Sequence, residues 1–254
     1  MPTAPDLLIL GSGSTAFAAA LRARSHGARV VMVEKSELGG TCVNWGCVPS
    51  KTLIHAAADY QAARLGTAIG LGTSAEAIDW PTLTAHKDGV VGYLRQTKYL
   101  DILAGVPGLE LIRGSGRFLD HQHIEVDGRV LTAERFLLAT GGAPRIIRFP
   151  GLDRVRYLTS QSALLLKEPP SSLVIIGGGV IALELGQMYR RFGVSVTILE
   201  HGPRVLLPFE PEPALALQEA LTAEGMAIHV NTDICGLAER DGLTVVSAEV
   251  AGQM

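Results

Sequence analysis

Two cysteines in the segment GGTCVNWGCVPSK could carry out thiol chemistry. Cys42 and Cys47 lie five positions apart in a chain of 254 residues that has only one other cysteine, Cys235. In a regular α-helix the Cα atoms of such a pair are about 8.6 Å apart, whereas a disulfide needs about 4.4–6.8 Å. Gly46 between the cysteines and Pro49 after them favour a loosened turn that leads into a helix. A disulfide is feasible in such a turn.

The spacing of the pair leaves its chemistry open. In a reducing compartment, a close pair of cysteines is more often catalytic or metal-binding than structural. On spacing alone, however, two ordinary buried thiols are the favoured interpretation. Cys235 is expected to be buried and to have no role in the chemistry.

A glycine-rich turn near the N-terminus has the spacing of a dinucleotide site. Gly11, Gly13 and Ala16 form the pattern G-x-G-x-x-A between an apolar run and a segment of small residues, and Glu34 ends the next apolar run. The first glycine permits a tight turn, the second lets the backbone approach a pyrophosphate, and the small third residue lets the helix pack on the strand. The pyrophosphate would lie at the helix N-terminus. Glu34 is placed to accept hydrogen bonds from a ribose.

The same pattern occurs a second time. Gly177, Gly179 and Ala182 repeat the turn, and Glu200 follows Gly177 by the same 23 residues that separate Glu34 from Gly11. The chain therefore contains a repeated βαβ unit and two predicted dinucleotide sites. Two dinucleotides in one chain usually serve to pass electrons between them.

Glu200 bears on the choice of nicotinamide cofactor. Its carboxylate would bond a ribose 2′-hydroxyl and repel a 2′-phosphate, so the sequence favours NADH over NADPH, although His201 and Arg204 lie close enough to complicate the choice. Beside a flavin, a pair of cysteines can accept electrons as a disulfide and pass them on as thiolates.

The elements that position these residues follow from the hydrophobic pattern. Helices are expected at residues 50–66 and 80–104, with Lys87, Arg95 and Lys98 on the polar face of the second. The fold class is α/β, with two Rossmann-like βαβ domains and a small antiparallel meander before Thr140. We place the domain boundary near Pro150, which predicts two dinucleotide-binding domains, one at 1–150 and an incomplete one at 151–254.

Composition excludes several classes of protein. The formal net charge is −3 and the sequence pI about 6.2, which argues against a nucleic-acid or membrane-surface partner. No apolar run reaches 18 residues, and the N-terminus lacks the basic segment of a signal peptide. A soluble cytoplasmic protein is expected.

The motifs GSGSTA, GGTCVNWGCVPSK, LLATGGAPR and GGGVIALELGQ together resemble those of the flavoprotein disulfide reductases. The resemblance extends from about residue 7 to residue 234. It strongly disfavours the interpretation of Cys42 and Cys47 as two ordinary buried thiols. It implies an FAD-binding domain at 1–150 with a redox-active disulfide and an incomplete NAD(P)H-binding domain at 151–254. The implied cofactors are FAD and NADH or NADPH, and the family forms a homodimer.

The resemblance also implies roles for individual residues. Cys42 would be the thiol that attacks the substrate, and Cys47 the thiol that faces the flavin as charge-transfer donor. Lys51 matches a buried lysine near the flavin, and Glu184 matches its carboxylate partner. The remaining residues expected to bind FAD are Lys35, Gly40, Thr41, Thr140 and Gly141.

Within the family, the sequence is most similar to the mercuric reductases. The segments LRQTKYLDIL, YLTSQSALLL and IALELGQMYRRFG are typical of them. Such an enzyme reduces Hg(II), held as a thiolate complex, to Hg(0), with Cys42 and Cys47 as transient ligands of this soft ion. Lipoamide dehydrogenase, which acts on a small disulfide, is the alternative, because Glu200 after VTIL is more typical of that branch.

The departures from the family define a third alternative. Family members continue into a C-terminal interface domain that supplies a His–Glu pair to the partner subunit, and mercuric reductases add a C-terminal cysteine pair; none of these is expected in this sequence. The chain could therefore be a truncated, non-catalytic fragment that binds FAD weakly.

Overall fold

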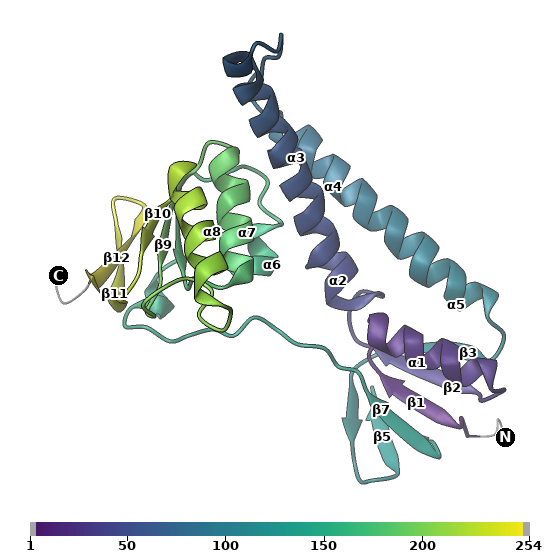
Figure 1. Cartoon of the computed structure of the whole chain (residues 1–254). Coiled ribbons are helices and arrows are strands. Elements are labelled where there is room, and N and C mark those ends of the chain that lie inside the picture. Colours follow the sequence, from purple (N-terminus) through teal and green to yellow (C-terminus); the bar gives the residue numbers. More distant parts are fainter. Residues whose placement is uncertain (1–3, 251–254) are drawn as a thin grey trace. The chain divides into compact units, whose positions relative to one another are not determined.

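The computed structural model describes residues 4–250 (Figure 1). Contacts divide the chain into two compact units. Unit 1 contains the residues up to Pro49 together with His86–Ala143, and unit 2 contains Ser50–Ala85 together with the residues from Pro144 onward. Two helices, α3 (Cys47–Gly66) and α4 (Trp80–Arg95), each begin in one unit and end in the other.

Unit 1 is built on a parallel sheet with the strand order β3-β2-β1-β7. Apolar runs form its strands, and helix α1 (Ser14–Ser25) joins β1 to β2 as the glycine pattern predicted. Ala16 and Ala20 are fully buried against the sheet, since their small side chains let the helix approach it closely. The strands are β1 (Leu7–Leu10), β2 (Val30–Glu34), β3 (Leu109–Arg113) and β7 (Arg135–Leu138).

The other elements of unit 1 include the predicted antiparallel meander. Its strands are β4 (Gly116–Phe118), β5 (His123–Val126) and β6 (Arg129–Thr132). The short helix α2 (Gly40–Asn44) precedes α3, and a π-helical turn, η2 (Gln96–Leu100), joins α4 to α5 (Asp101–Gly105).

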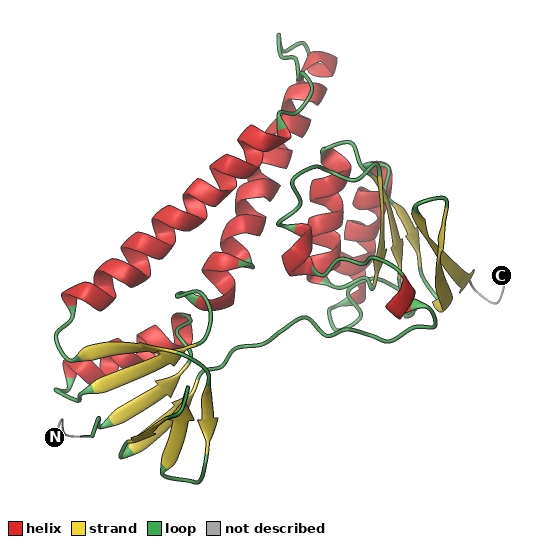
Figure 2. Cartoon of the chain, turned by 180° about the vertical axis from the view of Figure 1, so that it is seen from behind, coloured by secondary structure: helices red, strands yellow, loops and turns green. Residues whose placement is uncertain are grey.

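Unit 2 repeats the βαβ arrangement with the strand order β10-β9-β8. Helices α7 (Val180–Arg191) and α8 (Pro211–Ala223) lie on one face of this sheet (Figure 1 and Figure 2). The strands are β8 (Ser172–Ile176), β9 (Ser195–Leu199) and β10 (Ala227–His229), and an antiparallel hairpin of β11 (Thr232–Arg240) and β12 (Leu243–Val250) follows. Short elements are η1 (Thr67–Ile69), η3 (Leu152–Arg154) and α6 (Ser160–Ala163).

An aromatic cluster explains why residues 50–85 group with unit 2. Trp80 stacks on Tyr189 at 6.4 Å between ring centroids and meets Phe192 edge-on at 5.4 Å. The Tyr189 hydroxyl donates to the Ala163 carbonyl at 2.6 Å, and burial raises the pKa of Tyr189 to about 12. The core of unit 2 therefore includes the start of α4, a segment that lies before the predicted boundary at Pro150.

One expected helix face is wrong. Lys87 was placed on the polar face of α4, but its side chain is buried and its ammonium lies 2.7 Å from a carboxylate oxygen of Asp88. The reason is helical spacing: Lys87 comes four residues after Leu83 and three before Val90, so it belongs to their stripe.

The sequence prediction of the α/β class and of both βαβ units is confirmed. No helix in the described part of the chain is both long and apolar enough to span a membrane.

Candidate functional site

The glycine turn of unit 1 lies where the carboxyl ends of three parallel strands meet. The Gly11 amide donates to the Val33 carbonyl at 2.8 Å, and the Ala139 amide donates to the Leu10 carbonyl at 2.9 Å. Thr140 and Gly141 follow β7 after Ala139 at this edge and are exposed. In parallel sheets, ligands bind at such an edge.

The backbone at this edge fits the pyrophosphate and ribose of a dinucleotide. Helix α1 begins after Gly13 without a side-chain cap, so its first N–H groups can bond an anion. A Cβ atom on Gly40 would lie 2.7 Å from the Gly13 Cα atom, so only glycine permits this close approach. The Glu34 carboxylate is oriented by the Ser12 hydroxyl at 2.7 Å and by the Ser36 amide at 2.8 Å. Lys35, directly before Ser36, is exposed.

The two cysteines lie on either side of a break between helices. We call residues 40–47 the cysteine turn. Helix α2 ends at Asn44 and α3 begins at Cys47, so the pair does not lie on one regular helix. Gly46 is tightly packed, since a Cβ atom there would lie 3.1 Å from the Thr41 carbonyl oxygen. The predicted loosened turn is confirmed.

Both thiols of the turn are exposed free cysteines. The interpretation as two ordinary buried thiols is therefore wrong, because each sulfur is accessible to a reaction partner. A hydrogen bond to the Cys47 thiol raises the pKa of Cys42, and burial and the charge of Cys47 raise it further. The two side chains are thus in hydrogen-bond contact, and a charge on Cys47 makes Cys42 harder to ionise.

Tyr99 also belongs to this site, although it was not among the predicted site residues. Its ring meets Phe17 edge-on at 4.9 Å between centroids and borders Gly39. Burial raises the pKa of Tyr99, and the charge of Cys42 raises it further. Tyr99 lies in the π-helical turn η2, and such turns are frequent at functional sites. The available signal was the segment LRQTKYLDIL, which was noted only for its family likeness.

The phenol of Tyr99 is expected to titrate at a higher pH than free tyrosine. In a Cys42→Ala variant this midpoint should fall, because the repulsion from the Cys42 thiolate is removed, but burial should keep it above the free value. The ultraviolet difference titration between each protein and its Tyr99→Phe counterpart isolates this phenol. An unchanged midpoint after loss of Cys42 would show that the two groups do not interact.

Lys51 and Glu184 form an ion pair within unit 2. The Lys51 ammonium donates to a Glu184 carboxylate oxygen at 2.5 Å, and the two residues come from α3 and α7. Their side chains are 57% and 39% exposed, whereas the resemblance implied a buried lysine. An exposed pair of this kind contributes only about 0–1 kcal/mol to stability. The position of Lys51, one helical turn after Cys47 on α3, explains the pair better than its contribution to stability does.

The second glycine turn of the chain has the same architecture as the first. The Gly177 amide donates to the Leu199 carbonyl at 2.8 Å, and α7 begins after Gly179 without a side-chain cap. The Glu200 carboxylate accepts from the Gly178 amide at 2.5 Å and from the Gly202 amide at 2.6 Å. Ala182 lies in the first turn of α7.

Two basic residues beside Glu200 have partners of their own. The His201 ring lies 2.6 Å from an Asp233 carboxylate oxygen. The Arg204 guanidinium donates to backbone carbonyls of its own loop, at 2.8 Å to Leu206 and 2.7 Å to Phe209. Both basic side chains are therefore held by partners other than Glu200.

Cys235 corrects another expectation. It was predicted to be buried, but it is exposed on β11. Within residues 4–250, no three His, Cys, Asp or Glu side chains are grouped as a metal site.

Comparisons with known proteins agree with this geometry. A family model described as Pyridine nucleotide-disulphide oxidoreductase matches residues 5–252. A mercuric reductase from Staphylococcus aureus is 44% identical over 248 residues, which is 98% of this chain and 45% of the relative. A dihydrolipoyl dehydrogenase from Thermus scotoductus is 37% identical over 256 residues, which is 97% of this chain and 53% of the relative.

A solved structure has the same fold. The Cu(II) complex of the HOCl-induced flavoprotein disulfide reductase RclA from Escherichia coli matches with a TM-score of 0.84 at 27% identity, and the match covers 96% of this chain and 53% of that one. The chain thus spans about half the length of the relatives it matches.

Proposed function

The chain belongs to the pyridine nucleotide-disulphide oxidoreductase family, and on that premise we propose that it uses electrons from NADH first to reduce a Cys42–Cys47 disulfide and then, with a second NADH, to reduce Hg(II) held by the resulting dithiol. The observation that carries the proposal is the cysteine turn, where two exposed thiols in mutual contact lie in the same unit as a glycine turn with its ribose-binding acid.

FAD and a nicotinamide cofactor are implied by the family and by its flavoprotein members. When bound, FAD supplies two-electron transfer between the nicotinamide and the cysteine pair. Gly11, Gly13 and Gly40 would hold its pyrophosphate, and Glu34 its ribose. Lys51, one helical turn after Cys47 on α3, would contribute a positive charge that Glu184 orients.

The cysteines would act on the metal ion by ligand exchange. A Cys42 thiolate displaces one thiolate of a Hg(SR)₂ complex, and Cys47 displaces the other, so Hg(II) is held by two soft sulfur ligands. The overall reaction balances as Hg(SR)₂ + NADH + H⁺ → Hg(0) + NAD⁺ + 2 RSH. The raised pKa of Cys42 leaves less of this residue as the thiolate that performs the first exchange.

A second candidate is the reduction of a small disulfide. Its support is Glu200, together with the 37% identity to a dihydrolipoyl dehydrogenase. In that reaction Cys42 would form a mixed disulfide with the substrate, and no metal ion would be involved.

The test begins with the purified chain reconstituted with FAD under anaerobic conditions. A long-wavelength absorbance band that forms after NADH is added, and that requires Cys47, would support electron delivery to the pair. Hg(II)-stimulated, thiol-dependent NADH oxidation would then favour the mercuric ion, and lipoamide turnover the second candidate. If FAD is not retained, or if NADH does not reduce it, this chain does not perform the reaction alone and the proposal fails.

The Glu200→Ala variant is expected to raise the preference for NADPH over NADH by about tenfold or more, because the 2′-phosphate no longer meets a carboxylate. The ratio of kcat/KM values for the two cofactors measures this change, and calorimetric titration with 2′,5′-ADP and with AMP measures it without turnover. The matched control is Glu34→Ala in the other glycine motif, which should weaken FAD retention and leave the nicotinamide ratio unaltered. Equal ratios in wild type and Glu200→Ala would refute NADH selection by Glu200.

A further inference from the structure

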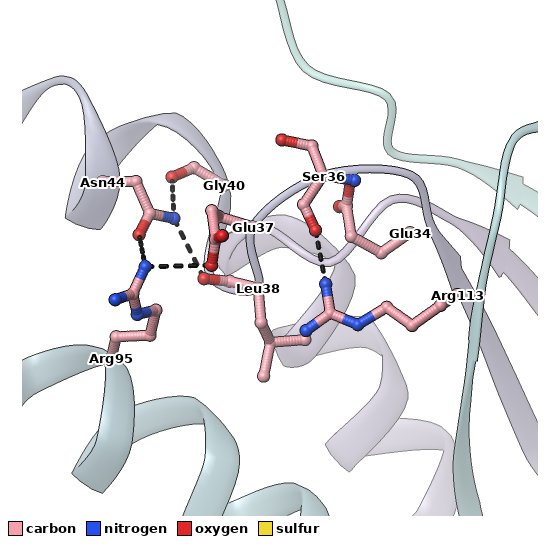
Figure 3. A network of polar contacts seen from close by, with 8 residues as sticks. All are labelled: Glu34, Ser36, Glu37, Leu38, Gly40, Asn44, Arg95 and Arg113. Carbon is pink, nitrogen blue, oxygen red and sulfur yellow. Dashed lines mark hydrogen bonds and ion pairs between the residues drawn. The ribbon is translucent and has the colours of Figure 1, made fainter. Parts of the chain in front are cut away.

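An arginine from a distant helix bonds the cysteine turn from outside (Figure 3). One terminal nitrogen of Arg95, in the last turn of α4, donates to the Glu37 carboxylate at 2.9 Å and to the Asn44 side-chain oxygen at 3.3 Å. Glu37 lies in the loop before α2, and Asn44 is the last residue of α2. The arginine thus joins the end of this short helix to the loop that precedes it.

Asn44 connects Arg95 to the interior of the turn. Its side chain is 7% exposed, and its amide nitrogen donates to the carbonyls of Leu38 and Gly40 at 2.9 Å each. These two bonds require the amide nitrogen to face the loop, which leaves the oxygen to accept from Arg95. A buried amide with all these partners has one orientation, so α2 is held in one position relative to the loop.

We propose that Arg95 is a positioning residue that sets the dithiol–disulfide equilibrium of Cys42 and Cys47. Cys42 lies in the middle of α2, whereas Cys47 begins the next helix, so the separation of the sulfurs depends on how firmly α2 is held. The inference rests on the proposed function, since it assumes that the pair cycles between the two redox states.

The physical link is effective concentration. Disulfide formation joins the two sulfurs and transfers two electrons to an external disulfide: dithiol + GSSG ⇌ intrachain disulfide + 2 GSH. When α2 moves more freely, the sulfurs meet less often and the equilibrium shifts toward the dithiol.

The chain contains a matched control in the same network (Figure 3). Arg113, at the end of β3, donates to the Ser36 backbone carbonyl, so it holds the same loop as Arg95. Within residues 4–250, Arg113 makes no hydrogen bond or ion pair to α2. Arg113→Met therefore removes an arginine of similar setting without releasing the helix that carries Cys42.

The experiment equilibrates the whole chain, without FAD, in glutathione buffers and counts the thiols that remain. Arg95→Met should lower the equilibrium constant for the disulfide about three- to tenfold, the scale of one net hydrogen bond, and Arg95→Lys should restore part of it. Arg113→Met should match the wild type. Denaturant unfolding of each variant shows whether all of them remain folded.

The outcomes separate the inference from the function on which it rests. If Arg95→Met and Arg113→Met have the same constant as the wild type, or shift it equally, Arg95 has only a structural role and the inference is wrong. If the wild-type chain forms no intrachain disulfide, the proposed function fails as well. If Arg95→Met is unfolded, the comparison passes to the Asn44→Asp variant, which loses the two amide donors and should shift the constant in the same direction.

Discussion

Substrate-dependent NADH oxidation is expected to fall by about three orders of magnitude or more in a Cys47→Ala variant, the scale of losing a nucleophile from an active site. The reason is that Cys42 alone can neither close an intrachain disulfide nor hold Hg(II) between two sulfurs. The measurement is steady-state NADH oxidation by the FAD-reconstituted chain, with and without a Hg(II)–thiolate complex.

The same variant makes a prediction for the remaining thiol. The hydrogen bond and the charge of Cys47 both raise the pKa of Cys42, so their removal should lower it, with burial alone keeping it raised. At a fixed pH below the midpoint, more Cys42 is then thiolate, and alkylation by iodoacetamide should be faster at the same pH. A midpoint equal to that of Cys42 in the wild type would contradict the sulfur–sulfur contact.

Gly11→Ala is expected to abolish FAD retention and to destabilise unit 1. The residue has φ +111°, and an added Cβ atom would lie 2.1 Å from the Ala139 carbonyl oxygen. Backbone strain and this overlap together should cost roughly 3 kcal/mol or more in the free energy of unfolding. Denaturant unfolding and the flavin content after gel filtration measure the two effects.

The equivalent glycine of the other motif provides the control. Gly177 has a similar φ of +104°, but no heavy atom of the described residues outside its chain neighbours lies within 4 Å of an added Cβ atom. The difference follows from sheet topology. In unit 1, β7 pairs with β1 on the side away from β2, whereas on the equivalent side of β8 no strand of residues 4–250 is paired. Gly177→Ala should cost only about 1–2 kcal/mol from strain. Equal losses in both variants would mean that the overlap with Ala139 is relieved.

Much of the fold could be predicted because its signals are local. The two glycine motifs predicted both βαβ units, and Gly46 with Pro49 predicted the break in the cysteine turn. These features depend on short stretches of sequence whose geometry follows from the residue types. The pairing of Lys51 with Glu184 is not local, since 133 residues separate them, and it was expected only from the family likeness.

The features that escaped prediction depend on contacts between distant segments. Tyr99 and Arg95 lie more than 50 residues from Cys42, and no local pattern places them beside it. The exposure of Cys235 and of Lys51 depends equally on packing that the sequence alone does not reveal. The misplaced Lys87 is different, since its helical spacing was available and was overlooked.

The π-helical turn η2 makes this site sensitive to changes in chain length. A π turn contains one residue more than the α-helical turn it replaces, so it behaves as an insertion that the helix has kept. Deleting one residue from Gln96–Leu100 would remove that extra residue and restore a regular helix, with α5 still in phase. The change would fall on Tyr99, whose contact with Phe17 belongs to this turn. Such a deletion would alter the site and leave α5 in register, whereas a deletion from a regular turn of α4 would rotate everything after it by about 100°.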